Sequence, residues 1–78
     1  MTYSITFFHK DRDRIVDMEN FCLDNFGDGR ETSPDELDEY FVDKRWGMYK
    51  PHIGESPLKW VFYFKNSDDA TLFKLTWT

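Results

Sequence analysis

The sequence predicts a single α+β domain over residues 1–78, in which a small antiparallel sheet of about three strands carries two or three helices on one face. The first observation behind this fold class is the alternation of residues 58–65, which is typical of a strand with one buried face. The second is the helical spacing of apolar residues over 15–26. The third is the helix-start signal Ser33-Pro34-Asp35-Glu36.

The first strand is expected over residues 2–8, where apolar and polar side chains alternate and Ile5 faces the core. A helix follows, with Asp11 or Asp13 as its N-cap. Gly27 is expected to end this helix in the left-handed conformation, which glycine adopts without strain. The core stripe of the helix consists of Ile15, Met18, Phe21, Cys22 and Phe26.

A second helix is expected to begin at Ser33 and to fade near Lys44. Ser33 is a suitable N-cap, Pro34 fits the first helical position, and Glu36 stands three residues after the serine, as a capping box requires. The acidic residues of the first turn also suit the positive end of the helix dipole. The core stripe of this helix consists of Leu37, Tyr40 and Phe41.

Residues 45–53 are expected to form a strand, and Pro51 would confine it to an edge of the sheet or end it early. A turn at residues 54–57 would then lead through a hairpin into the strand 58–65. This last strand holds the largest concentration of apolar area in the chain, so it is expected at the centre of the fold. Its core face carries Leu58, Trp60, Phe62 and Phe64, and its outer face carries Lys59, Val61, Tyr63 and Lys65.

The end of the chain allows two structures. Asn66-Ser67-Asp68-Asp69 is typical of a turn followed by a helix N-terminus, which favours a helix over the residues that follow. Residues 73–78 also alternate like a strand, and with a strand here the fold would become a ferredoxin-like βαββαβ sheet. The helix is the favoured interpretation, and the strand is the alternative.

Charge is divided unevenly along the chain. Residues 11–43 hold twelve acids against three bases, a net charge of −9, whereas residues 44–78 have a net charge of +3. The two expected helices therefore form an acidic layer over a mildly basic sheet. The overall charge of −5 disfavours general affinity for nucleic-acid backbones.

The sequence contains no recognisable catalytic, nucleotide or metal motif, so we expect a protein that is not an enzyme and that holds neither a cofactor nor a metal ion. His9, Asp11 and Asp13 approach a metal-ligand pattern, but aspartates at a helix start also serve as caps. Cys22 is expected to be buried, and a single cysteine favours a reducing compartment. No apolar run has the length of a membrane span or of a signal peptide, so the expected location is the cytoplasm, without a membrane partner.

Residues 60–77 read Trp60-Val61-Phe62-Tyr63-Phe64-Lys65-Asn66-Ser67-Asp68-Asp69-Ala70-Thr71-Leu72-Phe73-Lys74-Leu75-Thr76-Trp77. An aromatic strand, an acidic turn and an Ala-x-x-Phe-Lys-Leu-x-Trp ending resemble the ending of small uncharacterised accessory proteins of tailed bacteriophages. The resemblance covers roughly the last quarter of the chain. It implies a phage-encoded accessory protein, with the host cytoplasm as its location, and assigns no active residue.

These features together favour an interaction module that binds a host protein through the acidic helical layer, the aromatic edge of the sheet, or both. Carboxylates spaced along two helices can imitate backbone phosphates, so the expected partner is a protein that handles nucleic acid, which the module would inhibit. A homo-oligomer is also compatible with the sequence. The expected contact residues are Asp17, Asp24, Asp35, Glu36, Asp38, Glu39, Trp46 and Tyr63.

The alternative function is a small module for single-stranded nucleic acid that uses the outer face of the sheet. Lysine and aromatic side chains are interleaved there, as in stacking platforms for unpaired bases. Direct nucleic-acid binding is the less favoured interpretation, because the rest of the protein would repel phosphate. The residues of this expected platform are Arg45, Trp46, Tyr49, Lys50, Lys59, Val61, Tyr63 and Lys65.

Overall fold

The computed structural model describes residues 2–8, 12–51, 54 and 59–77. Within these residues the chain forms three strands and three α-helices, a small α+β fold of the expected class. The elements in order are β1 (Tyr3–Phe7), α1 (Arg12–Phe26), the 3-10 turn η1 (Pro34–Glu36), α2 (Leu37–Tyr40), β2 (Trp46–Tyr49), β3 (Trp60–Phe64) and α3 (Ser67–Trp77).

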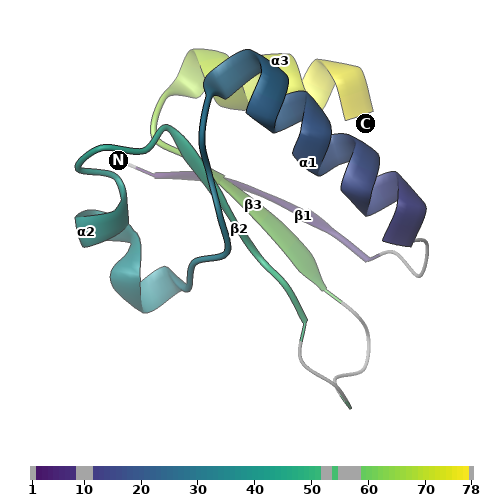
Figure 1. Ribbon diagram of the computed structural model, residues 1–78, viewed down its shortest axis with the longest axis horizontal. Coiled ribbons are helices and arrows are strands. Elements are labelled where there is room, and N and C mark those ends of the chain that lie inside the picture. Colours follow the sequence, from purple (N-terminus) through teal and green to yellow (C-terminus); the bar gives the residue numbers. More distant parts are fainter. Residues whose placement is uncertain (1, 9–11, 52–53, 55–58, 78) are drawn as a thin grey trace.

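The sheet is antiparallel, with the strand order β1-β3-β2, so the last strand of the sequence lies at the centre (Figure 1). Phe62 lies opposite Ile5 of β1 on one side and opposite Met48 of β2 on the other. The expected central position of this strand is confirmed. The expected edge position of the strand before Pro51 is confirmed as well, although β2 is shorter than the predicted 45–53.

The main core lies between one face of the sheet and the two longer helices, α1 and α3 (Figure 1). The Phe73 ring of α3 lies 4.8 Å from the Phe62 ring and 5.1 Å from the Phe64 ring, between centroids. At the far end of α3, the Trp77 ring packs edge-on against Phe21 of α1 at 6.0 Å. The buried residues of this core are Ile15, Met18, Cys22, Phe26, Trp46, Met48, Trp60, Phe62, Phe64, Ala70 and Phe73.

The opposite face of the sheet is also covered, which corrects the expectation of a strand with one buried face. Side chains alternate across a strand, so Val61 and Tyr63 point away from the main core. They are nevertheless only 7% exposed each, because Tyr40 and Phe41 of the α2 region pack over them. Two helices therefore lie on one face and α2 on the other.

The second helix differs from its prediction in length and in its cap. Instead of one helix to Lys44, a 3-10 turn at Pro34–Glu36 leads into a single α-helical turn, Leu37–Tyr40. Ser33 occupies the N-cap position but makes no side-chain cap hydrogen bond. The reason is that the Glu36 N–H donates instead to the Ser33 backbone carbonyl, at 3.1 Å. The predicted capping box is therefore wrong.

The end of the chain is a helix, α3, up to Trp77, so the ferredoxin-like alternative is wrong. Asp68 and Asp69 occupy its first turn, where carboxylates suit the positive end of the helix dipole. Gly27 follows α1 with φ +85°, in the left-handed region, as expected. No helix in the described part of the chain combines the length and apolarity that crossing a membrane requires.

Candidate functional site

The densest group of exposed charges lies on η1, α2 and the turn that follows them. We call this group the acidic surface: Asp35, Glu36, Asp38, Glu39 and Asp43. No basic residue interrupts the sequence between Arg30 and Lys44. Among the residues that the structure describes, none forms a salt bridge with these five carboxylates. Their charge is therefore directed at solvent rather than neutralised within the fold.

The short helix that carries this surface is positioned by tertiary contacts. A single helical turn is not stable alone, because nucleation is costly. Tyr40 fixes it: its hydroxyl donates to the Trp46 carbonyl at 2.6 Å and accepts the Arg30 N–H at 2.8 Å. Phe41 packs edge-on against the Tyr40 ring at 5.4 Å. The carboxylates thus stand on a backbone whose C-terminal end is held by two buried aromatic residues, Tyr40 and Phe41.

The Tyr40 hydroxyl keeps its proton at neutral pH. Burial raises the pKa of Tyr40 above its ordinary value, and the Arg30 backbone hydrogen bond opposes this only in part. A protonated hydroxyl can donate to one carbonyl while it accepts from an N–H group, which is the arrangement seen here. The anchor of the acidic surface is therefore unaffected by pH changes around neutrality.

A hollow of about 380 Å³ lies within the acidic surface. Three carboxylates and Tyr40 border it, together with two basic residues, Arg30 and Lys44, that precede and follow the acidic residues in the sequence. The Arg30 guanidinium lies 6.0 Å from the centre of the Tyr40 ring, which orders the basic side of the hollow. The lining residues are Arg30, Glu36, Glu39, Tyr40, Asp43 and Lys44. The hollow is therefore of mixed charge: Arg30 lies over the aromatic ring, and the carboxylates are the groups that can bind a basic side chain of a partner.

A second hollow, of about 570 Å³, lies beside η1 on the outer side of the sheet and contains part of the expected nucleic-acid platform. Its lining residues are Ser33, Pro34, Asp35, Tyr49, Lys59, Val61 and Tyr63. Lys59 and Lys65 are exposed, but Tyr63 is buried beneath the α2 region, and burial raises its pKa. The Tyr63 ring therefore offers little surface on which an unpaired base could stack.

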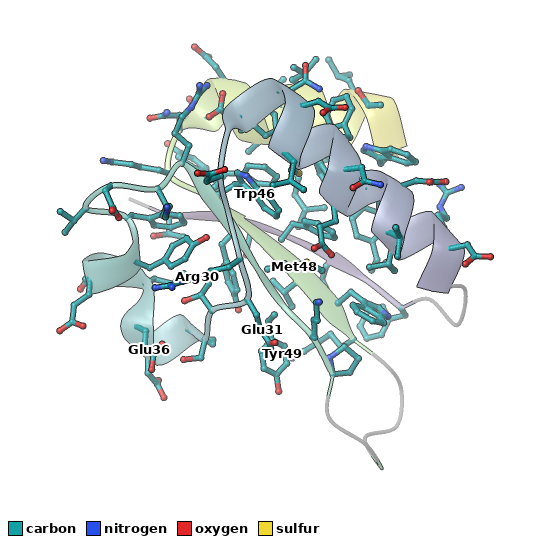
Figure 2. All side chains as sticks on the ribbon, viewed as in Figure 1. Arg30, Glu31, Glu36, Trp46, Met48 and Tyr49 are labelled. Atoms are coloured by element: carbon teal, nitrogen blue, oxygen red, sulfur yellow. The ribbon has the colours of Figure 1, made fainter. Side chains whose placement is uncertain are left out.

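Two of the eight expected contact residues lie on α1 and do not join the others. Asp17 and Asp24 are exposed, but α1 packs on the face of the sheet opposite to α2. The expected continuous acidic layer of two neighbouring helices is therefore wrong. The structure brings Asp35, Glu36, Asp38 and Glu39 together and adds Asp43. Figure 2 shows Glu36 on the outside of the η1 and α2 segment.

Trp46 does not lie on an exposed sheet face, contrary to expectation. Its side chain is fully buried between the sheet and α1 (Figure 2), and its indole N–H donates to the Gly27 carbonyl at 2.8 Å. Trp46 lies directly opposite Phe64 in the sheet, so both side chains are on the same face. That face is the one that packs in the main core. In this structure the indole has no surface to offer a partner.

The metal-like pattern of the sequence falls largely outside the described residues: His9, Asp11 and His52 lie there. Asp13 is exposed in the first turn of α1. Within the described ranges, no three His, Cys, Asp or Glu residues are grouped so that they could hold a metal ion. Cys22 is fully buried, and burial together with the charge of Glu19 raises the pKa of its thiol, so the thiol stays protonated.

One feature of this region had no signal in the sequence. The loop before η1 runs along the outer edge of β2, and Glu31 forms a parallel bridge with Met48. The Thr32 N–H donates to the Met48 carbonyl at 2.8 Å, and the Met48 N–H donates to the Arg30 carbonyl at 3.2 Å. This pairing connects the acidic surface directly to the sheet. A loop without periodicity gives no indication of such a contact.

The block that resembles the phage proteins divides between β3 and α3. Its aromatic residues Trp60, Phe62, Phe64 and Phe73 lie in the main core, so core packing accounts for them. Comparisons of the chain with protein-family models, curated proteins and solved structures find no match. The phage resemblance stays a prediction.

Proposed function

We propose that the protein is a non-enzymatic interaction module that binds a basic region of another protein through the acidic surface. The observation that carries this proposal is the set of five exposed carboxylates within residues 35–43, unpaired with any described residue and held on a firmly anchored segment. The resemblance of the closing block to phage accessory proteins supports a host protein as the partner.

The arrangement favours recognition by charge. Several like charges on a small area create a potential that attracts a basic partner over distances of about 8–10 Å near physiological salt. Such steering acts mainly on the association rate. After contact, the exposed carboxylates of Glu36, Glu39 and Asp43 at the hollow can form charge-assisted hydrogen bonds with a long basic side chain of the partner. A groove that ordinarily binds phosphates presents suitable lysine or arginine side chains, which supports a nucleic-acid-handling protein as the partner.

Asp17 and Asp24, the two expected contact residues on α1, supply a matched control. Asp38→Lys/Glu39→Lys reverses two charges on the acidic surface, and Asp17→Lys/Asp24→Lys reverses two charges on α1, on the other side of the sheet. Both variants change the net charge equally, and all four side chains are exposed. A difference in binding between them therefore reports the location of the surface rather than the total charge.

The test is capture of partners from bacterial lysate with the tagged protein, followed by association kinetics with the captured protein at low and near-physiological salt. The wild type and Asp17→Lys/Asp24→Lys should bind the same protein, and Asp38→Lys/Glu39→Lys should lose it through a slower association rate. Equal binding by all three proteins would refute the proposal. Displacement of the module by a short DNA duplex would show that it occupies a nucleic-acid groove.

The alternative, a module for single-stranded nucleic acid, has less support because the Tyr63 ring lies beneath Tyr40 and Phe41. Its test is a gel shift with short single-stranded DNA and RNA at low salt. Binding that is lost in Lys59→Glu/Lys65→Glu would favour this alternative over the acidic surface. No shift is expected.

A further inference from the structure

The two edges of the sheet differ. The outer edge of β2 is covered by the loop 30–32, whose backbone pairs with Met48. β1 forms the other edge, and no described segment pairs with its outer side. An uncovered edge presents unpaired N–H and C=O groups and is a template for another strand. The fold therefore protects one edge and leaves the other available.

The register identifies the groups on the free edge. Both backbone groups of Met48 point outward, to the loop, so Met48 and Phe62 are a non-hydrogen-bonded pair. The backbone groups of Phe62 must then point to β1, where Ile5 is its hydrogen-bonded partner. By the same alternation, Ser4 and Thr6 direct their N–H and C=O groups to the free edge. Their side chains are exposed as well.

The free edge lacks the devices that usually prevent strand addition. Natural sheets protect an exposed edge with charged side chains, proline, bulges or a covering segment. Residues 2–8 contain neither a charge nor a proline, and every β1 residue pairs with β3 without a bulge. In contrast, the covered edge strand β2 is followed directly by Lys50 and Pro51. An unguarded edge in a chain with 32% charged residues indicates that this edge has a partner.

The sequence of β1 is chemically symmetric about its centre. It reads aromatic, hydroxyl, isoleucine, hydroxyl, aromatic: Tyr3-Ser4-Ile5-Thr6-Phe7. If two such strands pair antiparallel with Ile5 opposite Ile5, each side chain meets one of its own kind. Aromatic and β-branched cross-strand pairs of this type stabilise a sheet. In this register Ser4 lies opposite Thr6 of the second copy, and the two exchange both of their outward backbone hydrogen bonds.

We propose that two copies of this protein associate through β1, in antiparallel register about Ile5, to form one continuous six-stranded sheet. The contact is isologous and has the two-fold symmetry that is commonest among homodimers. A hollow of about 400 Å³ beside β1, between the strand and α3, leaves room for the side chains of an added strand. It is lined by Thr2, Tyr3, Ser4, Ile5, Ser67, Ala70, Thr71 and Lys74.

Charge favours this edge over the rest of the surface for contact between two acidic chains. The residues of the hollow include no acid. The acidic surface belongs to the segment that packs over β3 and β2 rather than over β1, so it does not lie at the contact edge. The repulsion between two chains of charge −5 is therefore reduced at this edge. This inference does not depend on the proposed function.

Two variants test the register. In Ser4→Lys/Thr6→Lys, lysine would face lysine across the contact in both hydrogen-bonded pairs, which should dissociate the dimer. In Ser4→Lys/Thr6→Glu, opposite charges would face one another, and the dimer should persist. All the changes are at exposed positions, so each chain should fold as before, with an unchanged circular dichroism spectrum. Sedimentation velocity from low to high micromolar concentration measures the mass against the 9.5 kDa of one chain.

A second readout is amide hydrogen exchange. In a dimer paired through β1, the backbone N–H groups at positions 4 and 6 should exchange slowly in the wild type and rapidly in Ser4→Lys/Thr6→Lys. A wild type that stays at the mass of one chain at every concentration would overturn the proposal. A dimer that survives the two lysines, or that is lost equally in both variants, would overturn the β1 register.

Discussion

Arg45 and Asp69 form a two-point ion pair that joins the start of β2 to the first turn of α3. The Arg45 Nη2 donates to Oδ1 at 2.8 Å and its Nε donates to Oδ2 at 3.1 Å. The same guanidinium lies 5.7 Å from the centre of the Phe26 ring, at the end of α1. The Arg45 side chain, directly before β2, thus contacts both α3 and α1 at this end of the core, and the Asp69 carboxylate is largely buried.

Removal of the Asp69 charge should lower the melting temperature, because Arg45 would lose its carboxylate partner. The variant is Asp69→Asn, which keeps the shape of the side chain. Asp68→Asn is the matched control: it removes an exposed charge from the same first turn, and so has a similar effect on the helix dipole. Thermal unfolding followed by circular dichroism should show the larger decrease for Asp69→Asn. Equal decreases would mean that the ion pair contributes nothing beyond the dipole.

The Tyr40 hydroxyl should contribute measurably to stability. Tyr40→Phe leaves the Trp46 carbonyl and the Arg30 N–H without their partner, which should cost about 1–3 kcal/mol. Tyr63→Phe is the control, since the Tyr63 hydroxyl has no hydrogen-bond partner among the described residues and should be nearly neutral. Urea unfolding measures both. A neutral Tyr40→Phe would mean that water replaces the hydroxyl without loss.

Stability should fall at alkaline pH. Burial raises the pKa of Cys22, Tyr40 and Tyr63 above their ordinary values of 9.0 for the thiol and 10.0 for the phenols. The folded chain therefore binds these protons more tightly than the unfolded chain. Stability is fully retained below the ordinary pKa values and decreases as the pH rises above them, first through the thiol. Urea midpoints across this range measure the decrease.

Substitution of the thiol separates the two contributions to this pH dependence. In Cys22→Ala, the decrease should begin near pH 10, where the tyrosines begin to ionise in the unfolded chain, rather than near pH 9. The comparison uses the shape of each pH profile, because the variant also loses a buried side chain and its overall stability is lower. Identical profiles for the two proteins would contradict a thiol held in its neutral form by burial.

Phe62 lies at the centre of the sheet and should contribute strongly to stability. It is fully buried at the centre of β3 and contacts Phe7 and Phe73. Phe62→Ala should cost about 3–5 kcal/mol through the cavity that it leaves, and in a domain of this size that is most of the stability. Leu75→Ala, at a position 77% exposed, should change stability by less than about 0.5 kcal/mol. Chemical unfolding of the two variants gives the comparison.

The sequence predicted the elements whose patterns are local and strong. The strand β3, the helical stripe of α1 and the left-handed Gly27 were found where expected, because period and glycine chemistry depend on neighbours in the chain. The favoured helix after Asn66 was also confirmed, as α3, because its start is again a local signal. Its acidic start favours the N-terminus of a helix.

The features that the sequence did not predict depend on contacts between distant segments. The cover of Val61 and Tyr63 by Tyr40 and Phe41 turns an apparently exposed face into a second core, and no pattern within β3 alone distinguishes the two cases. The separation of α1 from α2 by the sheet is likewise a matter of topology. Consequently the charge of the candidate site could be predicted from composition, but its extent on the surface could not.

The position of β3 in the sheet has a consequence for biosynthesis. β1 and β2 do not pair with each other, and each pairs with β3, which ends at Phe64. A chain emerging from the ribosome at about 5–20 residues per second therefore has no three-stranded sheet until Trp60–Phe64 has been made. Closing the long loop between β1 and β3 slows folding more than it reduces stability. A chain that ends prematurely before β3 has neither core, so it would be a substrate for proteolysis rather than a shortened, active protein.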